Sequence, residues 1–481
     1  MAIRAVFGIV CLAMATMAPA GIALALENEA AMLAASQELR ARAIITALSS
    51  GDAATYELVA REHYSDALFA RRTPAERAAF VAQMAQDFSP MQIVSVTESA
   101  GALVVRVNGN GSVSGVLTFR FEDTPEQKIA RIEIEAEAGG DHGGPEDGPQ
   151  LPPPPIAPAQ SAADMGVAID RWIEPLLQHD DFAGVVLIAR DGRPYVTRAY
   201  GSANRALNIP AAEDTVYNVA SIGKTITQTA IARLIQDGRI TFATTVGEIL
   251  PDYPNVDARS ATIEQLLTMR GGISDFFGDD FQTQPKSRFN SNRAYYQYVS
   301  HLPQRFPPGA RNEYCNGCYV VLGEMVQRVS GMRYEDFVQL HVLTPAGMTR
   351  TAFLNAERLP RNAALPYVRS DGPGSPYVDS LDLHGAAGSG AGGIYSNALD
   401  LLAFDNALRE GRLLNAEMSA WVLGGAPSSG RNSTSLAIAG GAPGTSAVLE
   451  SDGHWTVIVT GNVHEPLPER IGVALARQLS R

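Results

Sequence analysis

The sequence of 481 residues has little lysine and little cysteine, and acidic residues outnumber basic ones. Only three of the 38 basic residues are lysine (Lys128, Lys224 and Lys286), there are three cysteines, and the formal net charge is −13. Nucleic acids and anionic membranes need clustered Lys and Arg side chains in a protein that binds them. Neither is therefore expected as a main partner, and so few cysteines exclude a disulfide-rich scaffold.

Long apolar runs are absent after residue 25, and the first 25 residues are predicted to be a targeting segment. They contain one basic residue, Arg4, and then an uncharged apolar stretch that ends in Ala23-Leu24-Ala25. This layout is typical of a secretory signal with a small-x-small cleavage site. An uncleaved anchor is the alternative, because the stretch is long enough to span a bilayer. Cleavage after about Ala25 is favoured, which predicts a periplasmic or secreted protein with no stable membrane span.

The remaining chain is predicted to contain two domains, because 481 residues are too many for one compact domain. No periodicity survives in the Pro- and Gly-rich stretch from 139 to 163, and Pro152–Pro155 predicts an extended, semi-rigid spacer. We place the small domain at residues 26–138, the linker at 139–163 and the large domain at 164–481.

Residues 26–138 are predicted to form a small α+β domain. Apolar positions recur at helical spacing over 30–47 and 75–84. Strand-like alternation follows in three segments, residues 102–107, 113–121 and 129–136, and the Asn-Gly-Asn-Gly sequence at 108–111 predicts a hairpin turn. In order and size these elements resemble the nuclear transport factor 2-like cone fold. His63 and Tyr64 either line a pocket there or form a solvated or half-buried pair, and the second interpretation is favoured.

The chemistry is predicted at the start of a helix in the large domain. Residues 215–220 predict a short extended segment, Ser221 follows directly, and apolar positions then recur at helical spacing until Gly238. Ser221 therefore lies at a helix N-terminus, where free backbone N–H groups favour developing negative charge. Lys224 lies one turn later on the same face, which gives a Ser-x-x-Lys motif.

A lysine beside this serine suits the role of a base. A serine hydroxyl is a weak nucleophile unless a neighbouring base removes its proton; a buried lysine can be that base, whereas arginine does not deprotonate in practice. A chain that otherwise uses arginine has placed one of its three lysines here. The motif also arises by chance, so its position at a strand-to-helix junction is the stronger indication.

A second motif precedes another predicted helix. Pro307-Pro308-Gly309 marks a loop, and the helix that follows it runs on to Gly331. Tyr314 is expected in the loop just ahead of that helix, where a phenol beside a cationic lysine can pass protons. Asn316 is expected to hydrogen-bond the lysine or a substrate amide.

These two motifs, together with the stretches 182–192, 263–268, 343–348 and 391–396, carry a family resemblance. From about residue 165 to the C-terminus the chain resembles the serine β-lactamase/penicillin-binding superfamily in its class C-like branch, which holds β-lactamases, D-alanyl-D-alanine carboxypeptidases, D-aminopeptidases and esterases. The resemblance implies an α/β fold, with an antiparallel sheet flanked by helices, a helical lobe and the site between them. It also implies that Ser221 is acylated, that Lys224 and Tyr314 share the proton transfers and that Asn316 orients the substrate.

The third motif of that family is altered here. Relatives carry Lys-Thr-Gly or His-x-Gly on a strand opposite the serine, whereas this chain has Ile438 followed by Ala439 and Gly440. Glycines at 440 and 441 still let the backbone approach a ligand closely. By the resemblance, the backbone N–H of Gly441 joins that of Ser221 as an oxyanion hole. Without the cationic side chain, a neutral ester, amide or D-amino-acyl substrate is favoured over efficient β-lactam hydrolysis.

Arg270 and a cysteine pair leave alternatives open. Arg270 lies where relatives commonly carry His-Thr-Ser-Gly, and it either restores positive charge for substrate binding or forms a structural salt bridge. Cys315 and Cys318 form either a local disulfide or a pair of buried free thiols.

The remaining features are predicted to be structural. Three histidines, His384, His454 and His464, are expected to be surface or satisfied side chains, and no metal site is predicted. At the C-terminus, residues 456–460 predict an edge strand and residues 468–479 a capping helix.

Together these features predict an exported serine hydrolase that needs no cofactor or metal and forms an acyl-enzyme with a small-molecule or peptide acyl substrate. The alternative, from another functional class, is a non-catalytic binder of peptidoglycan fragments or another small ligand. The oligomeric state is left open.

Overall fold

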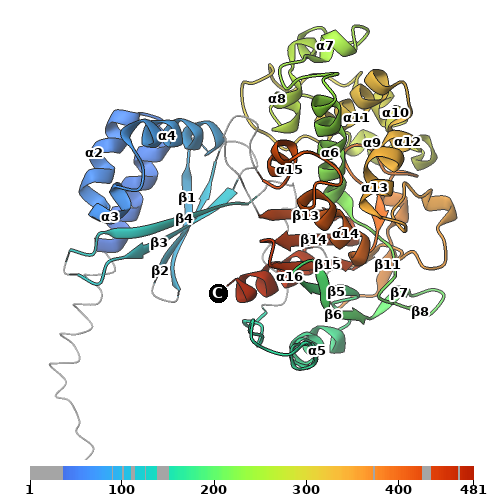
Figure 1. Ribbon diagram of the computed structural model, residues 1–481, viewed down its shortest axis with the longest axis horizontal. Coiled ribbons are helices and arrows are strands. Elements are labelled where there is room, and N and C mark those ends of the chain that lie inside the picture. The colour runs from blue at the N-terminus through green and yellow to red at the C-terminus, as the bar shows by residue number, and fades with distance from the viewer. Residues whose placement is uncertain are drawn as a thin grey trace, which may run out of the picture. The chain divides into compact units, whose positions relative to one another are not determined.

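The computed structural model (Figure 1) describes residues 36–88, 90–99, 102–109, 114–124, 126–137, 151–371, 374–424, 435–463 and 466–480. The chain divides into two compact units, with the division after residue 142. The predicted signal, residues 1–25, lies outside the described residues. No helix among the described residues combines the length and the apolar character that a membrane span requires.

The first unit contains helices followed by a four-stranded antiparallel sheet. The helices are residues 36–50, α2 (Ala53–His63), α3 (Asp66–Phe69) and α4 (Pro74–Phe88). The strands are β1 (Gln92–Ser99), β2 (Ala102–Asn108), β3 (Ser114–Phe121) and β4 (Ile129–Glu137), and they pair in chain order. The predicted order, helices and then an antiparallel meander, is confirmed.

Three elements of the first unit, α2, α3 and β1, are not predicted by the apolar pattern. Helix α2 buries only Tyr56 and Ala60, so little periodicity marks it, and it begins instead at Asp52, whose side chain accepts hydrogen bonds from two backbone N–H groups. Tyr64 is buried and its hydroxyl lies 2.7 Å from that of Tyr56, while His63 Nδ1 lies 3.2 Å from an Arg40 nitrogen. Of the predicted turn at 108–111, residues 110 and 111 lie outside the described residues, yet Asn108 pairs with Ser114.

The second unit is built on a five-stranded antiparallel sheet of order β13-β14-β15-β5-β6. Its strands are β5 (Gly184–Arg190), β6 (Arg193–Tyr200), β13 (Leu436–Ala442), β14 (Thr445–Ser451) and β15 (Trp455–Gly461). Successive strand residues point to opposite faces, and both faces of β5 are buried. Val186 and Ile188 pack with α5 (Ala162–Gln178) and α16 (Leu467–Leu479), whereas Leu187 packs in the core of the helical lobe.

The predicted edge strand at 456–460 is wrong, because β15 lies in the middle of the sheet between β14 and β5. All seven residues of β15 are buried. In the sequence, Thr456 and Thr460 alternate with valines, a pattern that is typical of a strand with one solvent-exposed face. In the structure the Thr456 hydroxyl is buried and lies 2.9 Å from that of Ser451. The predicted capping helix at 468–479 is confirmed as α16.

The spacer predicted at 139–163 is only partly a spacer. From residue 151 onward the chain packs on the second unit, where Ile156 is buried in the core against α5 and α16. The indole N–H of Trp172 donates to the carbonyl of Pro152 at 2.8 Å, and Gln478 donates to the carbonyl of Ile156 at 3.1 Å. Hydrogen bonds to the carbonyls of Pro152 and Ile156 therefore hold this segment on the second unit. Residues 139–150 lie outside the described residues.

The helical lobe (Figure 1) is arranged around α6 (Gly223–Gln236) and α11 (Asn316–Ser330). Helix α6 ends shortly before Gly238, which has φ +70°, and α11 ends at Gly331, which has φ +75°. Both C-termini agree with the sequence prediction. The first turns of these two helices carry Lys224 and Asn316. The predicted fold class, an antiparallel sheet flanked by helices with a helical lobe, is confirmed.

Candidate active site

Ser221 lies in a sharp turn between a short strand and helix α6. Strand β9 (Tyr217–Asn218) leads into a single 3-10 turn (Ala220–Ile222), and α6 follows at once. Ala220 has φ +43°, in the left-handed region, which costs a residue with a side chain about 1–2 kcal/mol. The Asn218 side-chain oxygen accepts the Ala220 N–H at 2.9 Å and holds the turn. This buried hydrogen bond stabilises the strained backbone conformation, which places the serine hydroxyl just ahead of the N-terminus of α6.

Two glycines let neighbouring backbone close on this turn. A Cβ at Gly392 would lie 2.3 Å from the carbonyl oxygen of Ala220, and a Cβ at Gly440 would lie 2.5 Å from the backbone nitrogen of Ser221. Any side chain at either position would collide with backbone atoms. Backbone therefore packs directly against the turn that carries the nucleophile from two sides. One side is strand β13, which holds the third motif, and the other is the loop before β12 (Tyr395–Ser396).

Lys224 is buried, with 6% of its surface exposed, and its Nζ contacts four oxygen atoms. These are Ser221 Oγ at 2.9 Å, Tyr314 OH at 2.7 Å, Asn316 Oδ1 at 2.6 Å and the carbonyl oxygen of Ala391 at 2.7 Å. The amide and carbonyl oxygens can only accept, so they take two hydrogens of the amine. A neutral amine then turns its lone pair toward the two hydroxyls, which is the arrangement that a base needs.

Tyr314 completes a triangle with Ser221 and Lys224. Its hydroxyl lies 2.6 Å from Ser221 Oγ, and the lysine nitrogen lies 4.7 Å from the centre of its ring. Tyr314 stands in the loop ahead of α11, as predicted. Glu313, which is buried beside it, forms ion pairs with Arg311 at 3.0 Å and with Arg305, so two arginines hold the loop in place.

Asn316 is oriented by Asp275, a residue that the sequence analysis does not single out. Asp275 Oδ2 accepts from the Asn316 side chain at 2.9 Å and from its backbone N–H at 3.3 Å. A carboxylate only accepts, so the amide nitrogen must face Asp275 and the amide oxygen must face Lys224. The structure thus brings Ser221, Lys224, Tyr314 and Asn316 together, as their two motifs predict.

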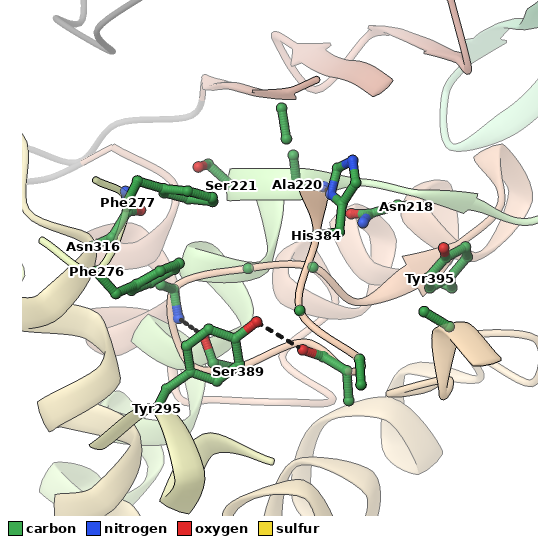
Figure 2. A pocket seen from close by; sticks show the side chains of 18 of the residues that line it. Asn218, Ala220, Ser221, Phe276, Phe277, Tyr295, Asn316, His384, Ser389 and Tyr395 are labelled. Atoms are coloured by element: carbon green, nitrogen blue, oxygen red, sulfur yellow. Dashed lines mark hydrogen bonds between the residues drawn. The ribbon is translucent and has the colours of Figure 1, made fainter. Parts of the chain in front are cut away.

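A pocket opens beside Ser221 (Figure 2), with about 600 Å³ of space when its mouth is counted. Its lining includes Phe276, Phe277, Tyr295 and Tyr395. Burial raises the pKa of Tyr295 and of Tyr395, so both phenols stay neutral. The described residues that line it include no Lys, Arg, Asp or Glu. The pocket is therefore suited to an uncharged group.

The third-motif residues lie on the edge strand β13. Gly441 lines the pocket, and Gly440 lies against the backbone of Ser221. Ile438, by strand alternation, points to the same side as Gly440, and it packs half-buried against the core of the helical lobe. No cation therefore comes to the site from this position.

The structure does not bring Arg270 to this pocket. Its guanidinium donates to the carbonyl of Gly309 at 2.6 Å, and Arg270 is not among the lining residues. The role predicted for it in substrate binding gains no support, since its charge is directed at a loop carbonyl. Cys315 and Cys318, whose state the sequence leaves open, form a disulfide at the start of α11.

His384 is buried and its Nε2 lies 2.8 Å from the carbonyl oxygen of Pro443, which agrees with the satisfied side chain that the sequence predicts. Its position in the pocket lining is not predicted. His454 is exposed and lies 2.7 Å from Asp191, whereas His464 lies outside the described residues. The described part of the chain contains no group of three or more His, Cys, Asp or Glu residues that could hold a metal ion.

Comparisons with known proteins find relatives of the second unit of the chain. The family model described as Beta-lactamase matches residues 169–462. The putative penicillin-binding protein PbpX of Bacillus subtilis is 28% identical over 259 residues, which are 53% of this chain and 62% of that protein. The chain therefore spans less than two thirds of that relative's length.

Two solved structures share the fold of the second unit. The penicillin binding protein from Bacillus halodurans is 24% identical, with a TM-score of 0.56 over 63% of this chain and 99% of its own. The D-amino acid amidase from Ochrobactrum anthropi is 21% identical, with a TM-score of 0.55 over 66% of this chain and 98% of its own. At these identities the likeness concerns the fold and not the substrate.

Proposed function

Because the chain belongs to the beta-lactamase family, whose model covers residues 169–462, we propose that it is an exported serine hydrolase that forms an acyl-enzyme at Ser221. The observation that carries the proposal is the contact of one buried lysine nitrogen with both the Ser221 and the Tyr314 hydroxyl. A nucleophile needs a base within about 2.6–3.2 Å, and both distances fall in that range. The predicted signal at residues 1–25 supports a location in the periplasm or outside the cell.

The proposed first step transfers one proton and forms one bond. Neutral Lys224 takes the Ser221 proton, directly or through the Tyr314 hydroxyl, while Ser221 Oγ bonds to the substrate carbonyl carbon. The backbone N–H groups of Ser221 and Gly441 would stabilise the negative oxygen that results. The leaving group then departs with a proton returned through Tyr314, and a water molecule later releases the acyl group from Ser221 by the same steps.

The uncharged lining of the pocket supports a neutral ester, amide or D-amino-acyl substrate. Neither Ile438 nor a lining residue offers a positive side chain to a substrate carboxylate. A charged group that enters such a pocket loses its hydration without gaining a partner. We therefore place esterase or D-peptidase activity ahead of efficient β-lactam hydrolysis.

Covalent labelling tests the proposal. The purified protein is incubated with a fluorescent fluorophosphonate and with a fluorescent penicillin, digested, and its peptides are analysed by mass spectrometry. We expect the phosphonate on the peptide that contains Ser221, with p-nitrophenyl esters protecting it from labelling. Well-folded protein that takes up neither probe would instead support the non-catalytic binder, which the altered third motif at Ile438 favours.

Restoring a cation in the third motif should shift substrate preference. Because Ile438 points to the same side of β13 as Gly440, a lysine in Ile438→Lys can reach toward a substrate carboxylate. We expect kcat/KM for nitrocefin to rise about 10-fold relative to that for p-nitrophenyl acetate, the scale of one hydrogen bond to a charged group. An equal change for both substrates would contradict the role assigned to this position.

A further inference from the structure

The turn between strands β13 and β14 has a sequence that is unusual for a tight hairpin. Ala442 pairs with Thr445, so Pro443 and Gly444 are the two central residues of the turn. Two-residue hairpins favour turn types with a positive φ at the first central position, because these types follow the twist of the strands. The ring of Pro443 fixes φ at about −65° and therefore excludes them.

Gly444 has φ +73°, which together with the preceding proline makes this a type II turn. A type II turn splays the two strands of a hairpin instead of following their twist. Strand β13 is at the edge of the described five-stranded sheet, where β14 is its neighbour on one side. The end of β13 at the turn therefore depends on contacts from outside the sheet to keep its position.

Two buried side chains supply such contacts. Ser380 Oγ donates to the carbonyl oxygen of Pro443 at 3.0 Å, and His384 Nε2 lies 2.8 Å from the same oxygen. A carbonyl oxygen only accepts, so the imidazole carries a hydrogen on Nε2, and both lone pairs of the oxygen are used. Ser380 is 1% and His384 8% exposed, so water competes little for these two hydrogen bonds.

Both donors come from one short segment that packs against the turn. Ser380 and His384 flank a single 3-10 turn (Leu381–Leu383). A Cβ at Gly444 would lie 2.5 Å from Ser380 Oγ and 2.5 Å from the backbone nitrogen of Tyr367. The segment therefore touches the hairpin turn directly, and its two hydrogen bonds fix the turn from outside the sheet.

The strand that ends in this turn also carries the third motif. Gly441 lies two residues before Pro443 and lines the pocket, as does His384 (Figure 2). The proposed reaction uses the Gly441 N–H as an oxyanion donor, which must lie about 2.7–3.1 Å from the negative oxygen. A displacement of about 1 Å in a group of this kind can lower the rate on the order of 100-fold.

We infer that Ser380 and His384 are positioning residues for the oxyanion hole. Through the Pro443 carbonyl they hold the end of β13, so that the Gly441 N–H is directed at the oxygen of the substrate carbonyl. The inference rests on the proposed function, which assigns that N–H to the hole. It adds two residues on which the reaction depends, although they act through the turn and not on the reacting atoms.

The variants His384→Leu and His384→Gln separate the hydrogen bond from the bulk of the side chain. Leucine has no donor, whereas the amide nitrogen of glutamine can donate to the Pro443 carbonyl. Rates are measured with p-nitrophenyl acetate and butyrate, below the melting temperature of every protein. We expect His384→Leu to lower kcat about 10-fold for both esters with KM within about threefold, and His384→Gln to stay within about threefold of wild type.

Three results of these assays would overturn the inference. One is wild-type turnover in both variants, and another is an equal loss of kcat in both, because the donor would then be irrelevant. The third is a loss confined to KM or to the larger ester, which would make His384 a contact of the substrate.

An inhibitor that places a negative oxygen in the hole measures the positioning directly. Ser221 Oγ bonds to the carbonyl carbon of phenyl trifluoromethyl ketone, its proton passes to Lys224, and the ketone oxygen takes the negative charge. We expect the inhibition constant to rise in His384→Leu by the same factor, about 10-fold, by which kcat/KM falls. A lower melting temperature with an unchanged inhibition constant would make the histidine merely structural and would contradict the inference.

Ser380→Ala keeps the inference testable if His384→Leu fails to fold. It removes the other donor to the Pro443 carbonyl, and Ser380 does not line the pocket, so no substrate contact is lost. We expect a three- to 10-fold lower kcat, about the value of one hydrogen bond, and an inhibition constant raised by the same factor. Unchanged values in folded Ser380→Ala would overturn the inference.

Ser300→Ala is the matched control, because Ser300 is also buried, at 2% exposed, and does not line the pocket. We expect its kcat to stay within about threefold of wild type. An equal loss in Ser300→Ala and Ser380→Ala would contradict a specific role for Ser380. Wild-type protein that hydrolyses no ester and takes up no phosphonate at Ser221 would instead refute the proposed function.

Discussion

The variant Ser221→Ala is expected to lose hydrolysis of every substrate by at least about 10⁴-fold and to take up no acylating probe, because the attacking oxygen is gone. Ser221 Oγ is the atom on which Lys224 Nζ and Tyr314 OH converge, at 2.9 and 2.6 Å. Steady-state hydrolysis of p-nitrophenyl esters and intact-protein mass spectrometry after phosphonate treatment measure the two effects. Alanine at this position leaves the strained Ala220 turn and its Asn218 hydrogen bond intact, so the fold should persist.

Ser389→Ala is the matched control for loss of a hydroxyl from this pocket. Ser389 is also a buried lining residue, and its hydroxyl accepts the Ala391 N–H at 3.2 Å rather than contacting Lys224. We expect less than about a 10-fold change in turnover and full labelling, since one neutral hydrogen bond is lost. Turnover that survives in Ser221→Ala but disappears in Ser389→Ala would place the nucleophile elsewhere.

Lys224→Arg should lower kcat/KM by at least about 100-fold, the low end of what a general base contributes. Arginine does not deprotonate in practice, so the substitution puts a permanent positive charge where the proposed mechanism needs a neutral amine. It also puts a larger, planar group where Asn316 Oδ1 and the Ala391 carbonyl hold the amine at 2.6 and 2.7 Å. Near-normal turnover in this variant would mean that the proton transfer is wrongly assigned.

Lys286→Arg is the control for the Lys-to-Arg change itself. Lys286 Nζ donates to three backbone carbonyls, those of Phe281, Gln282 and Gln284, at 2.9 to 3.2 Å, and it is not in the pocket lining. We expect its turnover to stay within about threefold of wild type, because a guanidinium can also donate to carbonyls.

A second lysine variant separates lost chemistry from lost structure. Lys224→Ala leaves space for a small primary amine, and added ethylamine should restore part of the activity in proportion to its concentration. Guanidine, which stays protonated, should not. Rescue by both compounds, or by neither in a variant with wild-type thermal stability, would contradict a role for the Lys224 nitrogen as a base.

The sequence predicts the residues around the serine well, because helical periodicity and two loop-to-helix junctions decide them locally. Ser221 and Lys224 share one helix face at three-residue spacing, so their contact needs no long-range information. Tyr314 lies in the loop just ahead of α11, and Asn316 is the first residue of that helix, 92 positions after Lys224. Their approach to the lysine follows from the family resemblance, not from spacing.

Sequence patterns do not reveal the role of a side chain where that role depends on contacts distant in the chain. Asp275 orients Asn316 across 41 positions, and His384 reaches Pro443 across 59. No local pattern marks either residue, since each lies in a connecting segment rather than in a periodic helix or strand. The central position of β15 was missed for the same reason, because strand order is set by pairing and not by composition.

The amino-acid pattern alone was enough to identify a serine and an amine on one turn of helix, and the absence of a cation at position 438. Both depend only on residues that are close together in the sequence. The regular geometry of helices and strands fixes where such residues lie relative to one another. The neutrality of the pocket and the orientation of the Asn316 amide were decided only by the tertiary structure. Each depends on which single donor or acceptor a distant segment brings within about 3 Å, and that is a property of packing.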